Sequence, residues 1–187
     1  MVPLSALWIP ILVAAVLVFV VSSIIHMFLT YHKADVKALP NEAAVADALR
    51  KFDIPPGDYV IPYAGSSAAM KSPEYQEKLA KGPVLFMTAM PKGPMTMGSS
   101  LVQWFLFCVL VAVFAAYVSG RALAPGAHYL TVFRFAGATA FAGYGLALLQ
   151  NSIWWKRNWG ATLRGVFDAL IYAGLTAGAL GWRWPSA

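Results

Sequence analysis

The longest uncharged stretch of the chain limits what it can fold into. Residues 4–29 contain no Lys, Arg, Asp or Glu. As an α-helix this stretch is about 39 Å long, enough to cross the roughly 30 Å hydrocarbon core of a bilayer with some tilt. No basic residue precedes it, and it is too long for the apolar part of a signal peptide. We expect it to be a retained membrane anchor.

Three further apolar stretches are long enough to span, at residues 99–119, 129–149 and 161–182. Short connections make these three antiparallel neighbours in sequence order. The predicted fold class is an all-α membrane protein, a four-transmembrane-helix bundle with a small α+β soluble insertion between helices 1 and 2. The predicted division of the chain is helix 1 over residues 1–31, the insertion over 32–98, and helices 2–4 over 99–187.

Composition supports this class. Only 12% of residues are charged, whereas soluble domains carry about 25%. The net charge of +6 lies mostly beside apolar stretches, so it indicates contact with lipid head groups and excludes nucleic acid as the expected partner. The single cysteine, Cys108, lies in an apolar stretch and is interpreted as a small buried side chain.

All seven tryptophans fall near the proposed ends of the spans, where an amphipathic ring is favoured. We therefore predict that they are lipid-facing anchors. They are Trp8, Trp104, Trp154, Trp155, Trp159, Trp182 and Trp184.

Lys and Arg predict the orientation, because they accumulate on the cytoplasmic side of membrane proteins. Arg121 and Arg183 flank the spans on the side that carries both termini. We therefore expect an inner (plasma) membrane protein with both termini outside and residues 32–98 in the cytoplasm. The richer, cytoplasmic side carries Lys33, Lys37, Lys92, Lys156, Arg157 and Arg164.

The insertion contains alternating helix and strand signals. Residues 41–52 have helical apolar periodicity, with Asn41 as a candidate N-cap. Ser72 begins a second short helix and Gly82 ends it. So small a unit buries little surface on its own, so we expect it to pack on the membrane, the helix ends or a partner. Strands are expected at residues 59–61 and 84–87.

Polar side chains gather at the predicted cytoplasmic end of the bundle. Asp168 and Arg164 lie four residues apart on one helix face, so we expect them to pair. Two interpretations remain open: a proton or substrate vestibule, or a hydrogen-bond network that locks the helices together, which we favour. The predicted cluster comprises His26, Gln103, Gln150, Asn151, Arg164 and Asp168.

Metal sites are not expected. His26 and His32 are six residues apart, which is not a same-face spacing on a helix, and no metal or cofactor motif occurs. A run of methionines is the only copper candidate, because thioethers suit Cu(I), but methionine also fills irregular gaps. We expect only weak Cu(I) binding and no cofactor. The methionines are Met87, Met90, Met95 and Met97.

Small residues form stripes on the last two spans. Gly137 and Gly143 lie on the third, and Gly174 and Gly178 form a G-x-x-x-G spacing on the fourth. Such glycines let helix backbones approach closely. Internal packing is the expected use, with self-association or docking to a larger complex as the alternative.

The sequence contains no recognisable reaction motif. The function that fits best is a non-catalytic accessory or assembly subunit of a larger membrane complex, with the bilayer and a protein partner or a second copy as its contacts. The alternative is a small oligomeric transporter or channel with a vestibule around Asp168, Arg164 and His26. An enzyme that acts on lipid ranks third.

The orientation can be tested by cysteine labelling. With an impermeant reagent on intact cells, we expect Ser5→Cys to react and Ser67→Cys to react only after permeabilisation, because the Lys and Arg side faces the cytoplasm. Reaction of Ser67→Cys alone in intact cells would reverse the orientation.

Overall fold

The structure is a computed structural model that describes all 187 residues. It is mostly helical (66%) with one two-stranded sheet. The chain divides into two compact units: a helical unit of Met1–Val36 and Thr96–Ala187, and an insertion unit of Lys37–Met95. Residues 32–36 and 96–98, which the sequence analysis assigns to the insertion, lie in the helical unit.

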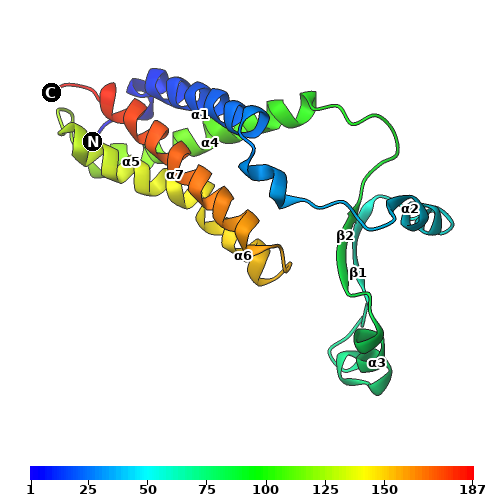
Figure 1. The fold of residues 1–187 in the computed structure, drawn as a ribbon. Coiled ribbons are helices and arrows are strands. Elements are labelled where there is room, and N and C mark those ends of the chain that lie inside the picture. Colours follow the sequence, from blue (N-terminus) through cyan, green and yellow to red (C-terminus); the bar gives the residue numbers. More distant parts are fainter. The chain divides into compact units, whose positions relative to one another are not determined.

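The helical unit contains four helices that are long and apolar enough to cross a membrane (Figure 1). This confirms the prediction of four apolar spanning segments and indicates a multi-pass membrane protein. The third span continues beyond its main helix into a 3-10 turn, Leu146–Leu148, and the short helix α6, Leu149–Ile153. The four main helices are α1 (Trp8–Phe28), α4 (Gly98–Ala122), α5 (Tyr129–Tyr144) and α7 (Trp159–Trp182).

Helix α7 packs against both α1 and α5, and α4 packs against the same two helices. Small side chains line the buried centre, which lets the backbones approach closely and gain dispersion contacts. Alanines therefore close much of the centre of the bundle, and a few larger side chains such as Val18, Val132 and Leu180 fill the rest. The buried alanines include Ala14, Ala15, Ala112, Ala115, Ala136, Ala140, Ala173 and Ala177.

The glycines of the stripes are not used equally. A Cβ added to Gly137 would lie 3.3 Å from Ala177, and one added to Gly143 would lie 3.2 Å from Val111, so both allow close contact. A Cβ at Gly174 would meet nothing within 4 Å. The expectation that Gly174 packs inside the chain is therefore wrong. A Cβ added to Gly178 would meet one neighbouring atom, the Tyr129 hydroxyl oxygen at 3.8 Å.

Both termini lie at the end of the bundle where α4 leads into α5 (Figure 1). The Val2 amide donates to the Gly120 carbonyl and the Gly126 amide donates to the Pro185 carbonyl, each at 2.8 Å. The opposite end carries α6 and a 3-10 helix, Tyr31–Asp35. An even number of passes places the termini together, as the four spans require.

Local sequence explains the shape of that opposite end. Helix α5 stops at Gly145, where an added Cβ would lie 3.0 Å from Ala169, so α7 approaches closely there. Asn158 caps α7 by accepting a hydrogen bond from the Gly160 amide at 2.7 Å. The Ser152 hydroxyl donates to Thr162 at 2.7 Å and ties α6 to α7.

The insertion unit contains a helix, a strand, a second helix and a second strand, as predicted. Ser72 caps the second helix by accepting from the Tyr75 amide, and Gly82 ends it at a positive φ of 62°. Asn41 occupies the predicted N-cap position of the first helix, but its side chain makes no cap hydrogen bond. No residue of this unit is buried. The elements are α2 (Glu42–Arg50), β1 (Gly57–Ile61), α3 (Pro73–Lys81) and β2 (Leu85–Ala89), with β1 and β2 antiparallel.

Two glycines of α7 test this packing. Gly181→Ala should lower the melting temperature in detergent, because the new methyl group would lie 2.8 Å from Tyr129 ring carbons and overpacking costs about 1–3 kcal/mol. Gly174→Ala, on the same helix with open space, is the control and should cause no loss. Equal destabilisation by both changes would contradict the packing described.

Candidate functional site

The candidate site lies where α1 ends. Helix α1 stops at Phe28, and Leu29 adopts an extended backbone that leads into the 3-10 helix Tyr31–Asp35. This turn brings the ring of His32 back onto that of His26, with centroids 4.4 Å apart. The expectation that these histidines cannot meet is therefore wrong, because helical spacing ceases to apply after Phe28.

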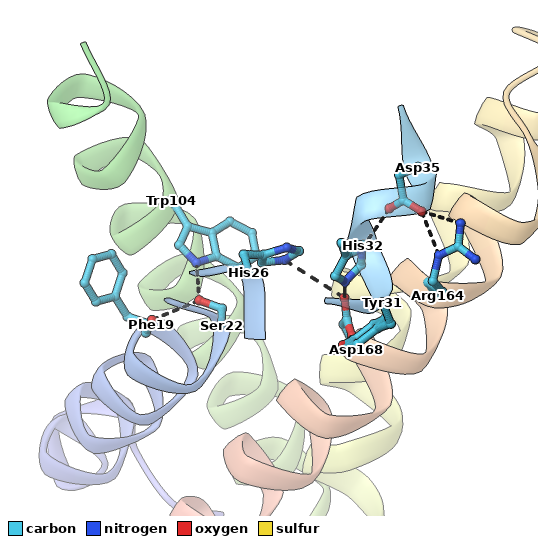
Figure 2. A network of polar contacts seen from close by, with 9 residues as sticks. All are labelled: Phe19, Ser22, His26, Tyr31, His32, Asp35, Trp104, Arg164 and Asp168. Atoms are coloured by element: carbon cyan, nitrogen blue, oxygen red, sulfur yellow. Dashed lines mark hydrogen bonds and ion pairs between the residues drawn. The ribbon is translucent and has the colours of Figure 1, made fainter. Parts of the chain in front are cut away.

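Asp168, on α7, is the centre of the site. It is only 2% exposed. The Tyr31 hydroxyl donates to its Oδ1 atom, and His32 Nε2 lies 2.8 Å from its Oδ2 atom (Figure 2). His26 Nε2 lies 4.0 Å from the same Oδ2. Three side chains from α1 and the segment after it thus surround one buried carboxylate of α7.

Arg164 has a different partner from the one predicted. Its Nε–H donates to Asp35 Oδ1 at 2.7 Å, and Nη2 forms an ion pair with the same oxygen (Figure 2). The predicted Arg164–Asp168 pair is therefore wrong. The two share a helix face, but the 3-10 segment brings Asp35 to the guanidinium, while Tyr31 and His32 occupy the carboxylate of Asp168.

His32 links the two carboxylates. Its Nδ1 lies 2.7 Å from Asp35 Oδ2, and its Nε2 faces Asp168. Tyr31, His32 and Asp35 were absent from the predicted cluster. A signal was present, since all three are polar and directly follow the first apolar stretch, but it becomes informative only once the helix is known to end at Phe28.

Electrostatics assign protonation states at two positions outside the spans. Burial raises the pKa of Tyr31 well above its ordinary value, and its hydrogen bond to Asp168 raises it further, so Tyr31 stays a neutral donor. Burial opposes ionisation of Asp35, but the hydrogen bonds from His32 and Arg164 outweigh it and hold the pKa of Asp35 below its ordinary value. Asp35 is therefore an anion at neutral pH.

A cavity of about 450 Å³ opens beside this cluster, within the range of small-molecule sites. Its lining includes the polar side chains of His26, His32 and Asp168. The lining also includes an apolar set that is mostly aromatic. The apolar and aromatic lining consists of Trp104, Phe107, Tyr144, Ala147, Leu148, Ala161 and Tyr172.

Trp104 is part of this cavity and is not a lipid-facing anchor, which corrects the prediction. Its indole N–H donates to the Ser22 hydroxyl at 2.8 Å, and its half-buried ring contacts the ring of Tyr172. Trp184 is also half-buried, and its indole N–H donates to the Ala124 carbonyl at 3.0 Å. The remaining tryptophans are exposed: Trp8, Trp154, Trp155, Trp159 and Trp182.

The other predicted site residues separate into two groups. Asn151 lines the cavity with His26 and Asp168. Gln103 and Gln150 are exposed and do not line it. Among the methionines, Met87 is half-buried on β2 opposite Tyr59, and the others are exposed. The exposed methionines are Met90, Met95 and Met97.

Comparison of the chain with protein-family models, with curated proteins and with solved structures finds no match. The chemistry of the site is therefore inferred from its own geometry.

The changed pairing can be tested by double-mutant cycles of unfolding free energy in detergent. Arg164→Gln and Asp35→Asn should show a coupling of roughly 0.5–3 kcal/mol, because the ion pair is direct. The coupling between Arg164→Gln and Asp168→Asn should be smaller. A larger coupling for the second pair would restore the pairing along α7.

Proposed function

We propose that this chain is a non-catalytic accessory protein of the inner membrane, and that it binds an amphipathic ligand of the lipid class in the cavity. The mixed polar and aromatic lining of the cavity supports the ligand class. Charged and amide groups would contact a polar head, and aromatic rings would contact an apolar chain.

One observation carries the binding proposal. The Tyr172 hydroxyl is buried and has no hydrogen-bond partner, and Tyr172 lines the cavity. A buried polar group without a partner costs about 1–3 kcal/mol, and such groups are rare in native proteins. A small shift of the Tyr172 ring toward the cavity would let a polar head group supply the missing partner. This hydroxyl makes no hydrogen bond within the chain that a ligand would have to break.

The position of the cavity supports binding over conduction. It lies at one end of the bundle, beside α6 and the 3-10 helix, while buried alanines close the centre. A pathway through a single copy of the chain would have to open that packing. The transporter alternative, with a vestibule at Asp168, Arg164 and His26, therefore needs a route between several copies.

The orientation is part of the proposal. With the termini outside, the cavity belongs to the cytoplasmic leaflet, and Arg157 on its rim suits an anionic head group. The open space at Gly174 on α7 suits contact with another membrane helix, as an accessory role requires.

Lipid analysis after mild detergent extraction tests the proposal. The purified chain should retain about one amphiphile per copy, measured by native mass spectrometry. Ala147→Trp should reduce retention several-fold, because the indole would fill the cavity that Ala147 lines. Ala138→Trp is the matched control, since Ala138 is exposed on α5 and does not line the cavity.

Tyr172→Phe gives a second readout. It should weaken retention while leaving the melting temperature unchanged or raised, because it removes a hydroxyl without a protein partner. Absence of any retained amphiphile in the wild type, or equal retention in Ala147→Trp and Ala138→Trp, would contradict the proposed function.

A further inference from the structure

We propose that His26, His32 and Asp168 together bind a divalent first-row transition-metal ion, with Zn²⁺ as the reference ion. This inference goes beyond the proposed function and does not depend on an amphiphile in the cavity. It is carried by the positions of the three ligand atoms, by the partners that orient them and by the charge of the cluster.

The three side chains can reach one ion. One ligand atom from each lies within 4.8 Å of the other two. Asp168 Oδ2 is 2.8 Å from His32 Nε2 and 4.0 Å from His26 Nε2. An ion held at about 2.0–2.2 Å from nitrogen and oxygen ligands needs ligands separated by about 3.4 Å in a tetrahedron. Small side-chain rotations bring both separations to that value.

The residues around these ligands have the partners that metal sites use. A ligating histidine usually gives its other ring N–H to a carboxylate, which sets the tautomer and makes the ring a better ligand. His32 Nδ1 faces Asp35 in this way, at 2.7 Å, and Arg164 holds Asp35. Tyr31 donates to Asp168 Oδ1 and leaves Oδ2 facing the histidines.

The contact between His32 Nε2 and Asp168 Oδ2 needs a positive group between the two atoms, which is either a proton or a metal ion. A neutral imidazole has one N–H. If His32 Nδ1 donates that hydrogen to Asp35, its Nε2 lone pair faces a carboxylate oxygen at 2.8 Å, which is repulsive. A metal ion in place of that proton, with the two atoms moved apart to about 3.4 Å, converts this repulsion into two coordinate bonds.

The charge of the cluster also supports a metal ion. The cluster contains two carboxylates, Asp35 and Asp168, and Arg164 is committed to Asp35. Arg157 lines the cavity but forms no ion pair with Asp168. A carboxylate that is 2% exposed is costly without a positive partner. That partner is either a proton held on His32, whose Nε2 lies 2.8 Å from Asp168, or a divalent ion in its place, and the titration below distinguishes the two.

The ligand types and the access select the class of ion. Two imidazoles with one carboxylate suit zinc and its first-row neighbours, and suit Mg²⁺ or Ca²⁺ poorly. His26 is 54% exposed in its side chain, and all three ligands line the cavity. Three protein ligands with an open position toward a cavity are typical of zinc sites that take water or a small ligand.

Zinc titration of the full-length protein tests the site. The protein is purified in detergent without a histidine tag, stripped with EDTA and titrated with Zn²⁺ against a chromogenic chelator. We expect one Zn²⁺ per chain. His26→Gln, His32→Gln and Asp168→Asn should each raise the Kd at least tenfold, and Asp35→Asn should raise it because His32 loses its orienting partner.

His128→Gln is the matched control. His128 caps α5 at the opposite end of the bundle, where its Nδ1 accepts from the Leu130 amide, so its removal should leave the Kd unchanged. Substoichiometric Zn²⁺ binding by the wild type, tight binding that survives in the His26→Gln, His32→Gln double variant, or equal weakening by His128→Gln would overturn the proposal.

A second measurement uses the wild type, so it does not depend on the folding of variants. Cu²⁺ loaded into the stripped protein should show, by pulsed electron paramagnetic resonance, coupling to two imidazole rings. Coupling to none or to one would overturn the assignment of His26 and His32 as joint ligands. The two-ring signal should be retained in His128→Gln.

Discussion

The buried carboxylate of Asp168 is the group on which this end of the molecule depends. An ionisable group within a membrane helix is costly unless it has partners. Tyr31 and His32 supply those partners from the segment that follows α1. The chain turns at Leu29 instead of continuing as a helix, and this turn brings their side chains to α7. One polar requirement thus joins the end of the first span to the last span.

The same requirement shapes the cavity. The 3-10 helix places Asp35 beside Arg164, and Asp35 in turn holds His32 at the lining of the cavity. Trp104 completes the enclosure, because its hydrogen bond to Ser22 joins α4 to α1 and its ring packs near Tyr144 and Tyr172. Polar contacts between helices fix the positions, and aromatic rings fill the space.

The predictions that succeeded rest on local chemistry. Four spans follow from apolar length, and the second helix of the insertion follows from the Ser72 cap and the Gly82 stop. Two predictions about the polar cluster failed because α1 ends at Phe28 and the following segment turns onto α7. Asp35 of that segment pairs with Arg164 in place of Asp168, and His32 meets His26.

The sequence alone determined that the chain is helical, that four segments can cross a membrane, and that the insertion has little core of its own. Each of these properties is set by residues that are close together in the chain, because apolar length and turn chemistry depend on neighbouring positions. Only the tertiary structure decided which polar groups meet, because Tyr31 and Asp168 are 137 residues apart. Their contact depends on where a helix stops and which of its faces the next helix covers, and no local pattern carries that information.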